Sequence, residues 1–163
     1  MNASDLVHIF VFGIFVSFLG YDLLFYQWYQ RGSGEKDGHT STLLQISLSI
    51  NIGCTIFCYL KGYENNLSIM VLGLFFCLIG LFIRVWSIKT LNKFFSWKID
   101  IQKGHQLVQK GPYRIIRHPS YSGGILAMVG FNMALGTWPA LCFFVLGHIP
   151  IILFRIRAEE KVL

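Results

Sequence analysis

Hydrophobic residues occur along this chain in five long runs that short polar segments separate. A helix needs roughly 20 apolar residues to cross about 30 Å of hydrocarbon, and the first three runs approach that length. The last two runs are shorter. The pattern predicts an all-α, polytopic membrane protein with about five transmembrane helices, organised as a single integral-membrane domain over residues 1–163. The predicted helices span residues 6–26, 42–60, 67–88, 121–135 and 138–154.

The last two predicted helices are joined only by Gly136 and Thr137. Such a short connection predicts a tight antiparallel hairpin. Pro139 suits the first turn of the second helix of this hairpin, where a missing N–H costs little. Further along, Pro150 should remove a helical hydrogen bond and kink the helix. The neighbouring His148 is either a buried, hydrogen-bonded side chain or part of a cavity that the kink shapes.

Three glycines open the fourth predicted helix, at positions 123, 124 and 130. Small residues let helix backbones approach closely in lipid, which makes packing one explanation. Close approach of a ligand to the backbone is the other, and the sequence leaves both open.

Composition agrees with a membrane protein. The chain is 54% hydrophobic and 13% charged, whereas soluble domains average about 45–50% and about 25%. The high aromatic content excludes disorder, and the length leaves no room for an additional Rossmann-type nucleotide-binding domain. The four cysteines lie inside apolar runs and the histidines show no metal-ligand spacing. We therefore expect neither a disulfide framework nor a metal site.

The net charge of +6 is unevenly distributed. Eight of the 14 Lys and Arg residues lie on or beside the segment between the third and fourth predicted helices. Loops rich in Lys and Arg stay on the cytoplasmic side. With the amino terminus outside, every Lys and Arg except Lys61 falls on the inner side, together with the basic loop and the carboxyl terminus. Nucleic acid is not an expected partner, because no binding motif accompanies the basic residues and they flank membrane segments.

Residues 104–123 (GHQLVQKGPYRIIRHPSYSG) are the densest polar cluster. Pro112 and Pro119 restrict the residues before them to extended conformations, which predicts an ordered, non-helical loop. Such a backbone at membrane depth must be buried in protein or line a cavity. A second cluster covers residues 155–163, where Arg155 and Glu159 are i,i+4 neighbours. These two form either a surface ion pair or, with the loop, the enclosure of a zwitterionic ligand.

With these motifs the chain resembles the integral-membrane isoprenylcysteine carboxyl methyltransferase family, which is related to the phospholipid methyltransferases. The resemblance runs from Arg84 to Leu163 and rests on HQLVQKGPYRIIRHPSYSG, the hydrophobic hairpin and RIRAEEKVL. It implies a methyltransferase core over residues 84–163, consisting of a cofactor loop (98–121), a hairpin (121–154) and an Arg/Glu motif (155–163). It also implies S-adenosyl-L-methionine as cofactor, S-adenosyl-L-homocysteine as product, and a lipophilic or prenylated acceptor.

The resemblance also implies roles for individual residues. Glu159 would hold the ammonium group of the cofactor, and Arg155 would face the acceptor substrate. Arg84, Arg117 and Arg155 would be catalytic. The implied cofactor-binding residues are His105, Gln106, Leu107, Val108, Tyr113, His118, Pro119, Ser120, Tyr121 and Glu159. Asn92 departs from the family, whose members usually have glycine there.

The implied reaction is carboxyl O-methylation of an isoprenylcysteine-like substrate. A carboxylate acceptor is already ionised at neutral pH and needs no general base, which favours O- or S-methylation over N-methylation. Alternatives are a phospholipid or thiol methyltransferase, a membrane reductase related to sterol reductases, and a non-enzymatic small transporter or scaffold. A transporter should show inverted repeats with broken helices, whereas the polar residues here gather at one end.

Overall fold

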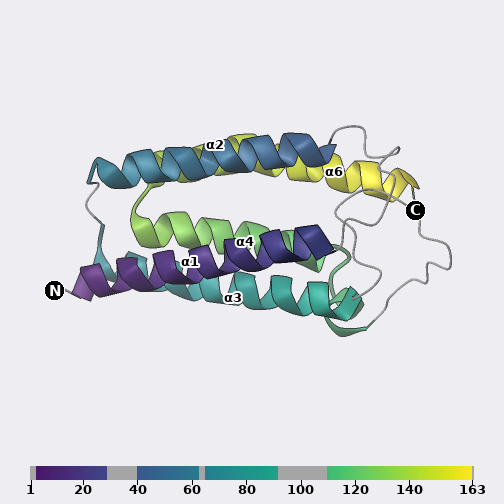
Figure 1. Ribbon diagram of the computed structural model, residues 1–163, viewed down its shortest axis with the longest axis horizontal. Coiled ribbons are helices and arrows are strands. Elements are labelled where there is room, and N and C mark those ends of the chain that lie inside the picture. Colours follow the sequence, from purple (N-terminus) through teal and green to yellow (C-terminus); the bar gives the residue numbers. More distant parts are fainter. Residues whose placement is uncertain (1–2, 29–39, 63–64, 92–109, 163) are drawn as a thin grey trace.

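A computed structural model describes residues 3–28, 40–62, 65–91 and 110–162 of this chain (Figure 1). The described part is helical and contains no strand, which confirms the predicted fold class. All five predicted hydrophobic segments are helical. The elements are α1 (Ala3–Trp28), α2 (Thr40–Leu60), α3 (Leu67–Leu91), η2 (Gly111–Arg114), α4 (Pro119–Leu135), α5 (Trp138–Phe143), η3 (Phe144–His148) and α6 (Ile149–Val162).

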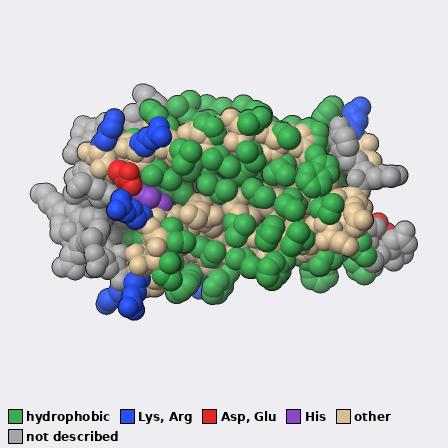
Figure 2. All heavy atoms as spheres, turned by 180° about the vertical axis from the view of Figure 1, so that it is seen from behind, with side chains coloured by type: hydrophobic (Ala, Val, Ile, Leu, Met, Phe, Trp, Pro, Cys, Tyr) green, Lys and Arg blue, Asp and Glu red, His purple; other side chains and the backbone are tan. Residues whose placement is uncertain are grey.

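The helices run side by side along the long axis of the molecule. Figure 1 shows α1, α3 and α4 together on one side and α2 with α6 on the other, and α1 begins at the end opposite to that where α6 finishes. The long segments Thr40–Leu60, Leu67–Leu91 and Trp138–Lys161 are each long and apolar enough to cross a membrane. Figure 2 shows hydrophobic side chains across the middle of one face, with charged side chains near the ends. The protein is an integral membrane protein.

The closest helix pair is α3 with α4, and glycines make the approach possible. A Cβ atom added at Gly80 would lie 2.3 Å from the backbone nitrogen of Ala127, and one at Gly130 would lie 2.3 Å from that of Cys77. No side chain fits at such distances, so the two backbones are in direct contact. Packing is therefore the explanation for Gly123 and Gly130, whereas Gly124 faces the side chain of Arg84.

The predicted turn between the last two hydrophobic segments is present. Gly136 adopts a left-handed conformation (φ 68°) and its N–H donates to the carbonyl of Met133, while Thr137 N–H donates to Asn132. The expected tight hairpin needs a correction, because α4 packs chiefly against α3 and the helix beyond the turn packs chiefly against α2. The glycines allow α4 to pack closely against α3. The last helical segment, residues 138–162, packs against α2 and forms the polar contacts with it that are described below.

The two prolines of the last helical segment have different effects. Pro139 lies in the first turn of α5, as predicted. Pro150 does not end the helix. The expected disturbance takes the form of a π-helical turn, η3, just before it, in which the N–H of Ile149 donates to the carbonyl of Phe144. Such turns occur within α-helices, frequently at functional sites. His148 closes η3, is buried, and lies 2.6 Å (Nδ1) from the hydroxyl of Ser47.

Candidate functional site

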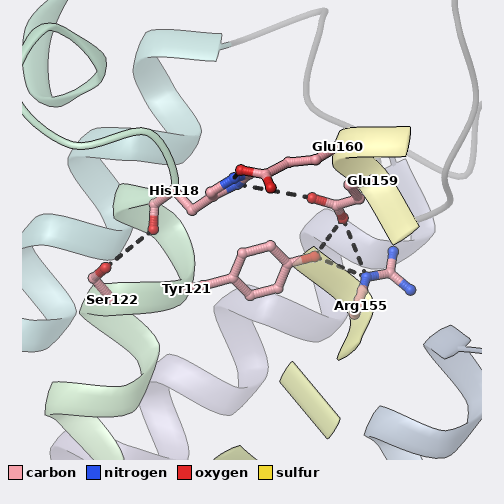
Figure 3. A network of polar contacts seen from close by, with 6 residues as sticks. All are labelled: His118, Tyr121, Ser122, Arg155, Glu159 and Glu160. Atoms are coloured by element: carbon pink, nitrogen blue, oxygen red, sulfur yellow. Dashed lines mark hydrogen bonds and ion pairs between the residues drawn. The ribbon is translucent and has the colours of Figure 1, made fainter. Parts of the chain in front are cut away.

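The candidate site lies where α4 begins and α6 ends (Figure 3). Pro119 begins α4, two residues before the predicted start. Proline suits this position because its φ is preset for a helix and its missing N–H would have no partner there. Pro119 and Ser120 are therefore helical and not part of a loop, which corrects the sequence prediction, whereas Tyr121 lies in the helix that was predicted from residue 121. His118 immediately precedes the helix, and its side chain points towards the end of α6.

The segment before His118 also differs from the predicted non-helical loop. Pro112 lies inside the short 3-10 helix η2. The residue before it, Gly111, has a φ of 57°, which is left-handed and not extended. A Cβ atom there would lie 2.9 Å from Thr90 Oγ1 and 3.3 Å from Trp86 Nε1, so η2 is seated on the end of α3. Glycine permits both the conformation and the close approach.

Tyr121, Arg155 and Glu159 form the buried part of the site. The Tyr121 hydroxyl donates to Glu159 Oε1 over 2.5 Å and accepts from Arg155 Nε over 2.7 Å. Arg155 Nε lies 3.3 Å from the same carboxylate oxygen. Arg155 is only 2% exposed, so the alternative of a surface ion pair between these i,i+4 neighbours is wrong. One oxygen of Glu159 is thus held by two donors in a largely dry environment.

The opposite side of the Glu159 carboxylate faces His118. Oε2 lies 4.0 Å from His118 Nδ1, and His118 Nε2 lies 3.2 Å from Glu160 Oε1. The exposed fraction is 22% for the side chain of Glu159 and 47% for that of Glu160. The cluster therefore changes from buried at Arg155, through the partly buried Glu159 and His118, to exposed at Glu160.

Tyr113 and Arg84 lie beside this cluster. Arg84 Nη1 donates to the carbonyl of Ser120 over 3.4 Å. Burial and the Glu159 carboxylate raise the pKa of Tyr113 above its ordinary value, while the Arg84 guanidinium opposes this increase. The phenol, the carboxylate and the guanidinium therefore share one neighbourhood, and Tyr113 is a neutral hydrogen-bonding group at physiological pH.

The structure also shows a contact that the sequence did not reveal. Arg155 Nη1 donates to Thr40 Oγ1 over 3.1 Å, and both residues are buried. Thr40 ends the polar segment RGSGEKDGHT in the sequence, where nothing distinguishes it from a linker residue. No sequence pattern near position 40 could have linked it to position 155.

The remaining predicted site residues are not all placed in the cluster. Pro119 is buried at the start of α4 and Ser120 contributes its backbone carbonyl. The side chain of Arg117 is exposed. His105, Gln106, Leu107 and Val108 lie outside the described residues.

The fold and the cluster define a polytopic helical membrane protein with an ordered group of Arg, Glu and Tyr side chains at one end of the bundle. The sequence model of the isoprenylcysteine carboxyl methyltransferase (ICMT) family matches residues 71–163, more than half of the chain. The chain belongs to this family. The match begins within α3 and includes every site residue described above except Thr40.

Individual relatives agree with the family assignment. The chain is 32% identical over 81 residues to the uncharacterized protein YpbQ of Bacillus subtilis, covering 50% of this chain and 48% of that protein. It is 34% identical over 79 residues to protein-S-isoprenylcysteine O-methyltransferase B of Arabidopsis thaliana, covering 47% and 40%. It is 33% identical over 113 residues to protein-S-isoprenylcysteine O-methyltransferase of Saccharomyces cerevisiae, covering 66% and 47%. The chain thus spans about half the length of these curated relatives, or less. No solved structure gives a significant match.

Proposed function

We propose that this protein is a membrane methyltransferase that uses S-adenosyl-L-methionine to methylate the carboxylate of a lipophilic, isoprenylcysteine-like acceptor. Family membership and the names of the plant and yeast relatives support the activity. The observation that carries the proposal is the arrangement of Glu159. Its Oε1 is fixed by Tyr121 and Arg155, while Oε2 makes only a 4.0 Å approach to Nδ1 of the partly exposed His118 among the described residues.

The residues present fit this cofactor. S-adenosyl-L-methionine supplies a transferable methyl group on a sulfonium and also carries an ammonium and a carboxylate. Among the described residues, Glu159 Oε2 has only the long contact with His118, so it suits the ammonium group. The rings of Tyr113 and Tyr121 offer faces for a sulfonium, a contact worth about 0.5–2 kcal/mol. The ring N–H of His118 suits the carboxylate.

The chain's own residues would bind, orient and exclude water. A carboxylate acceptor is ionised at neutral pH, so correct aim and desolvation are the main requirements. The sequence predicted that Arg155 faces the acceptor. Because its Nε and Nη1 already donate to Tyr121 and Thr40, we now assign Arg155 to the support of Glu159. We assign the acceptor carboxylate to Arg84, which also donates to the Ser120 carbonyl but is only half-buried, whereas Arg155 is 2% exposed.

We further propose that the site faces the cytoplasm and that α1 begins on the opposite side. The distribution of Lys and Arg supports this orientation, since only Lys61 would then lie outside. The acceptor would enter from the inner leaflet, where its carboxylate can remain at the polar surface while its lipid tail stays in the bilayer.

Binding of S-adenosyl-L-homocysteine tests the cofactor site. Calorimetric titration of the detergent-purified protein should show binding of this product and none of NADPH, which a reductase would bind. Glu159→Gln should weaken binding about 10- to 100-fold, because hydrogen bonds to charged groups are worth about 1.5–3 kcal/mol. Glu160→Gln is the matched control, and we expect less than a threefold change. Equal effects of the two substitutions on binding would show that Glu159 does not hold the ammonium group. Absence of binding by the wild-type protein would overturn the proposal.

Transfer of a radiolabelled methyl group tests the reaction. The acceptors would be a prenylated cysteine, a long-chain thiol and a phospholipid. Treatment of the product with alkali releases methanol from a methyl ester, but not from a thioether or an amine. We expect alkali-labile label on the prenylated cysteine. Alkali-stable label on the thiol or the phospholipid would instead identify the protein as a thiol or phospholipid methyltransferase and would contradict carboxyl methylation.

A further inference from the structure

The buried face of α2 is polar, although this helix is one of the apolar membrane spans. Its outward side carries exposed hydrophobic residues such as Ile46, Ile50 and Phe57. Its buried residues are Thr40, Ser47, Asn51, Thr55 and Cys58. The spacing of seven, four and four residues between the four polar members places them on one side of an α-helix. A polar stripe therefore follows the inner side of α2 from the candidate site towards the opposite end.

Three members of this stripe bind groups in the following helices, beyond the site. Ser47 Oγ lies 2.6 Å from His148 Nδ1 in η3. Asn51 Nδ2 donates to the carbonyl of Ala140 over 2.9 Å, and the Thr55 hydroxyl donates to Asn132 Oδ1 over 2.9 Å. A shift of α2 by one residue would turn every one of these groups by about 100°. The contacts therefore fix both the rotation and the axial position of α2.

This register brings Thr40 to Arg155. Thr40 lies two turns before Ser47 on α2, and Arg155 lies two turns after His148 on the last helix. The Thr40–Arg155 contact therefore lies about 10 Å along the helices from the Ser47–His148 contact. Thr40 Oγ1 accepts from Arg155 Nη1, while Arg155 Nε is directed to Tyr121 and Glu159. A guanidinium is planar, and contacts at two of its nitrogens fix the orientation of that plane.

We propose that Thr40 is a positioning residue that orients Arg155 and, through Arg155, sets the Glu159 carboxylate for binding the methyl donor. This inference rests on the proposed function. It assigns a role in the site to α2, which lies outside the residues 71–163 that match the family. Without the hydroxyl, the guanidinium loses the acceptor that Thr40 supplies, and its plane can turn away from Tyr121 and Glu159. Glu159 would then no longer be held in one position for an ammonium group.

Isosteric substitution separates this role from a general loss of stability. Thr40→Val removes the hydroxyl and keeps the shape, whereas Thr40→Ser keeps the hydroxyl. Thr55→Val is the matched control, because it removes another buried interhelical hydroxyl on the same face of α2, away from the site. We expect Thr40→Val to weaken binding of S-adenosyl-L-homocysteine at least tenfold in calorimetry. Thr40→Ser should bind within threefold of the wild type, and so should Thr55→Val, even where its thermal midpoint is lowered.

A double-mutant cycle with Arg155→Lys tests whether Thr40 acts through Arg155. Interacting residues show non-additive effects, so Thr40→Val should have less than a threefold effect on binding in the Arg155→Lys background. Wild-type binding by Thr40→Val, equal losses in Thr40→Val and Thr55→Val, or additive effects in the cycle would each overturn the role of Thr40 while the proposed function stands. Failure of the wild-type protein to bind S-adenosyl-L-homocysteine would instead overturn the proposed function, together with this inference.

Discussion

At the scale of single residues, Tyr113 makes a pH-dependent contribution to stability. Burial is the main cause that raises the pKa of its phenol, the Glu159 carboxylate adds to the increase, and Arg84 opposes it. The folded protein therefore holds this proton more tightly than the unfolded chain, in which the pKa is about 10. The contribution of Tyr113 to the free energy of unfolding is therefore fully present below the pKa of its phenol in the unfolded chain. It is lost as the pH rises towards and through the pKa of the phenol in the folded protein.

We accordingly expect the thermal midpoint of the wild-type protein to fall more steeply above about pH 10 than that of Tyr113→Phe. Differential scanning fluorimetry in one detergent, over a series of alkaline buffers, measures both curves. Below pH 9 the two curves should run parallel, which serves as the internal control. Parallel curves throughout the alkaline range would show that Tyr113 ionises as easily in the folded protein as in the unfolded chain.

The sequence was a good guide to some residues of the site and a poor guide to others. His118, Tyr121 and Glu159 belong to recognisable motifs, and the structure brings them together from the start of α4 and the end of α6. The burial of Arg155 was not predictable, since its partner Thr40 is 115 positions away in the sequence. Contacts between such distant positions depend on how the helices pack, which hydrophobic periodicity does not specify.

At the scale of helices, the contact between α3 and α4 predicts opposite effects of the same substitution. A Cβ atom at Gly80 would meet the backbone of α4, whereas one at Gly53 on α2 would have no atom within 4 Å. Gly80→Ala forces two backbones apart and should lower stability by about 1–3 kcal/mol, as overpacking does. Gly53→Ala should leave stability unchanged or raise it by up to about 1 kcal/mol, because alanine favours helix.

Thermal unfolding of the two variants in the same detergent provides the comparison. The substitutions add the same atom, so differences in expression or detergent affinity largely cancel. Equal thermal midpoints for Gly80→Ala and the wild type would contradict this prediction. They would mean that α3 and α4 can move apart without loss of stability.

The helices themselves could be predicted because length and hydropathy determine them, and each predicted segment is helical. Their partners could not. The glycines at positions 123 and 130 allowed either packing or ligand binding until α3 was seen to carry Gly73 and Gly80 opposite them. Likewise, the short turn at Gly136 suggested a close pair of helices, but a turn fixes only where two helices meet and not which surfaces stay in contact along their length.

At the scale of the whole molecule, the distribution of apolar and charged side chains defines a membrane-embedded middle and two polar ends. Large hydrophobic side chains such as Phe57, Phe82 and Leu146 are exposed along the bundle. In water, such a surface would be an aggregation hazard, whereas in a bilayer it faces lipid. The candidate site and most of the exposed basic residues of the described chain lie at one of the ends (Figures 2 and 3). If the protein has the proposed function, orientation therefore decides which compartment supplies the methyl donor.

Labelling of introduced cysteines with a membrane-impermeant maleimide in intact cells tests that orientation. Ser68 is exposed at the start of α3, and Arg114 is exposed at the opposite end of the bundle, in η2. With the site in the cytoplasm, Ser68→Cys should react in intact cells and Arg114→Cys only after permeabilisation. Of the native thiols, Cys58 and Cys77 are buried and should stay unlabelled, because the reaction needs a solvated thiolate. Cys142 is exposed, so any label that it takes up is measured in the unmodified protein. The unmodified protein is thus its own background control. Reaction of Arg114→Cys in intact cells would invert the orientation and place the site on the side that the proposed cytosolic methyl donor cannot reach.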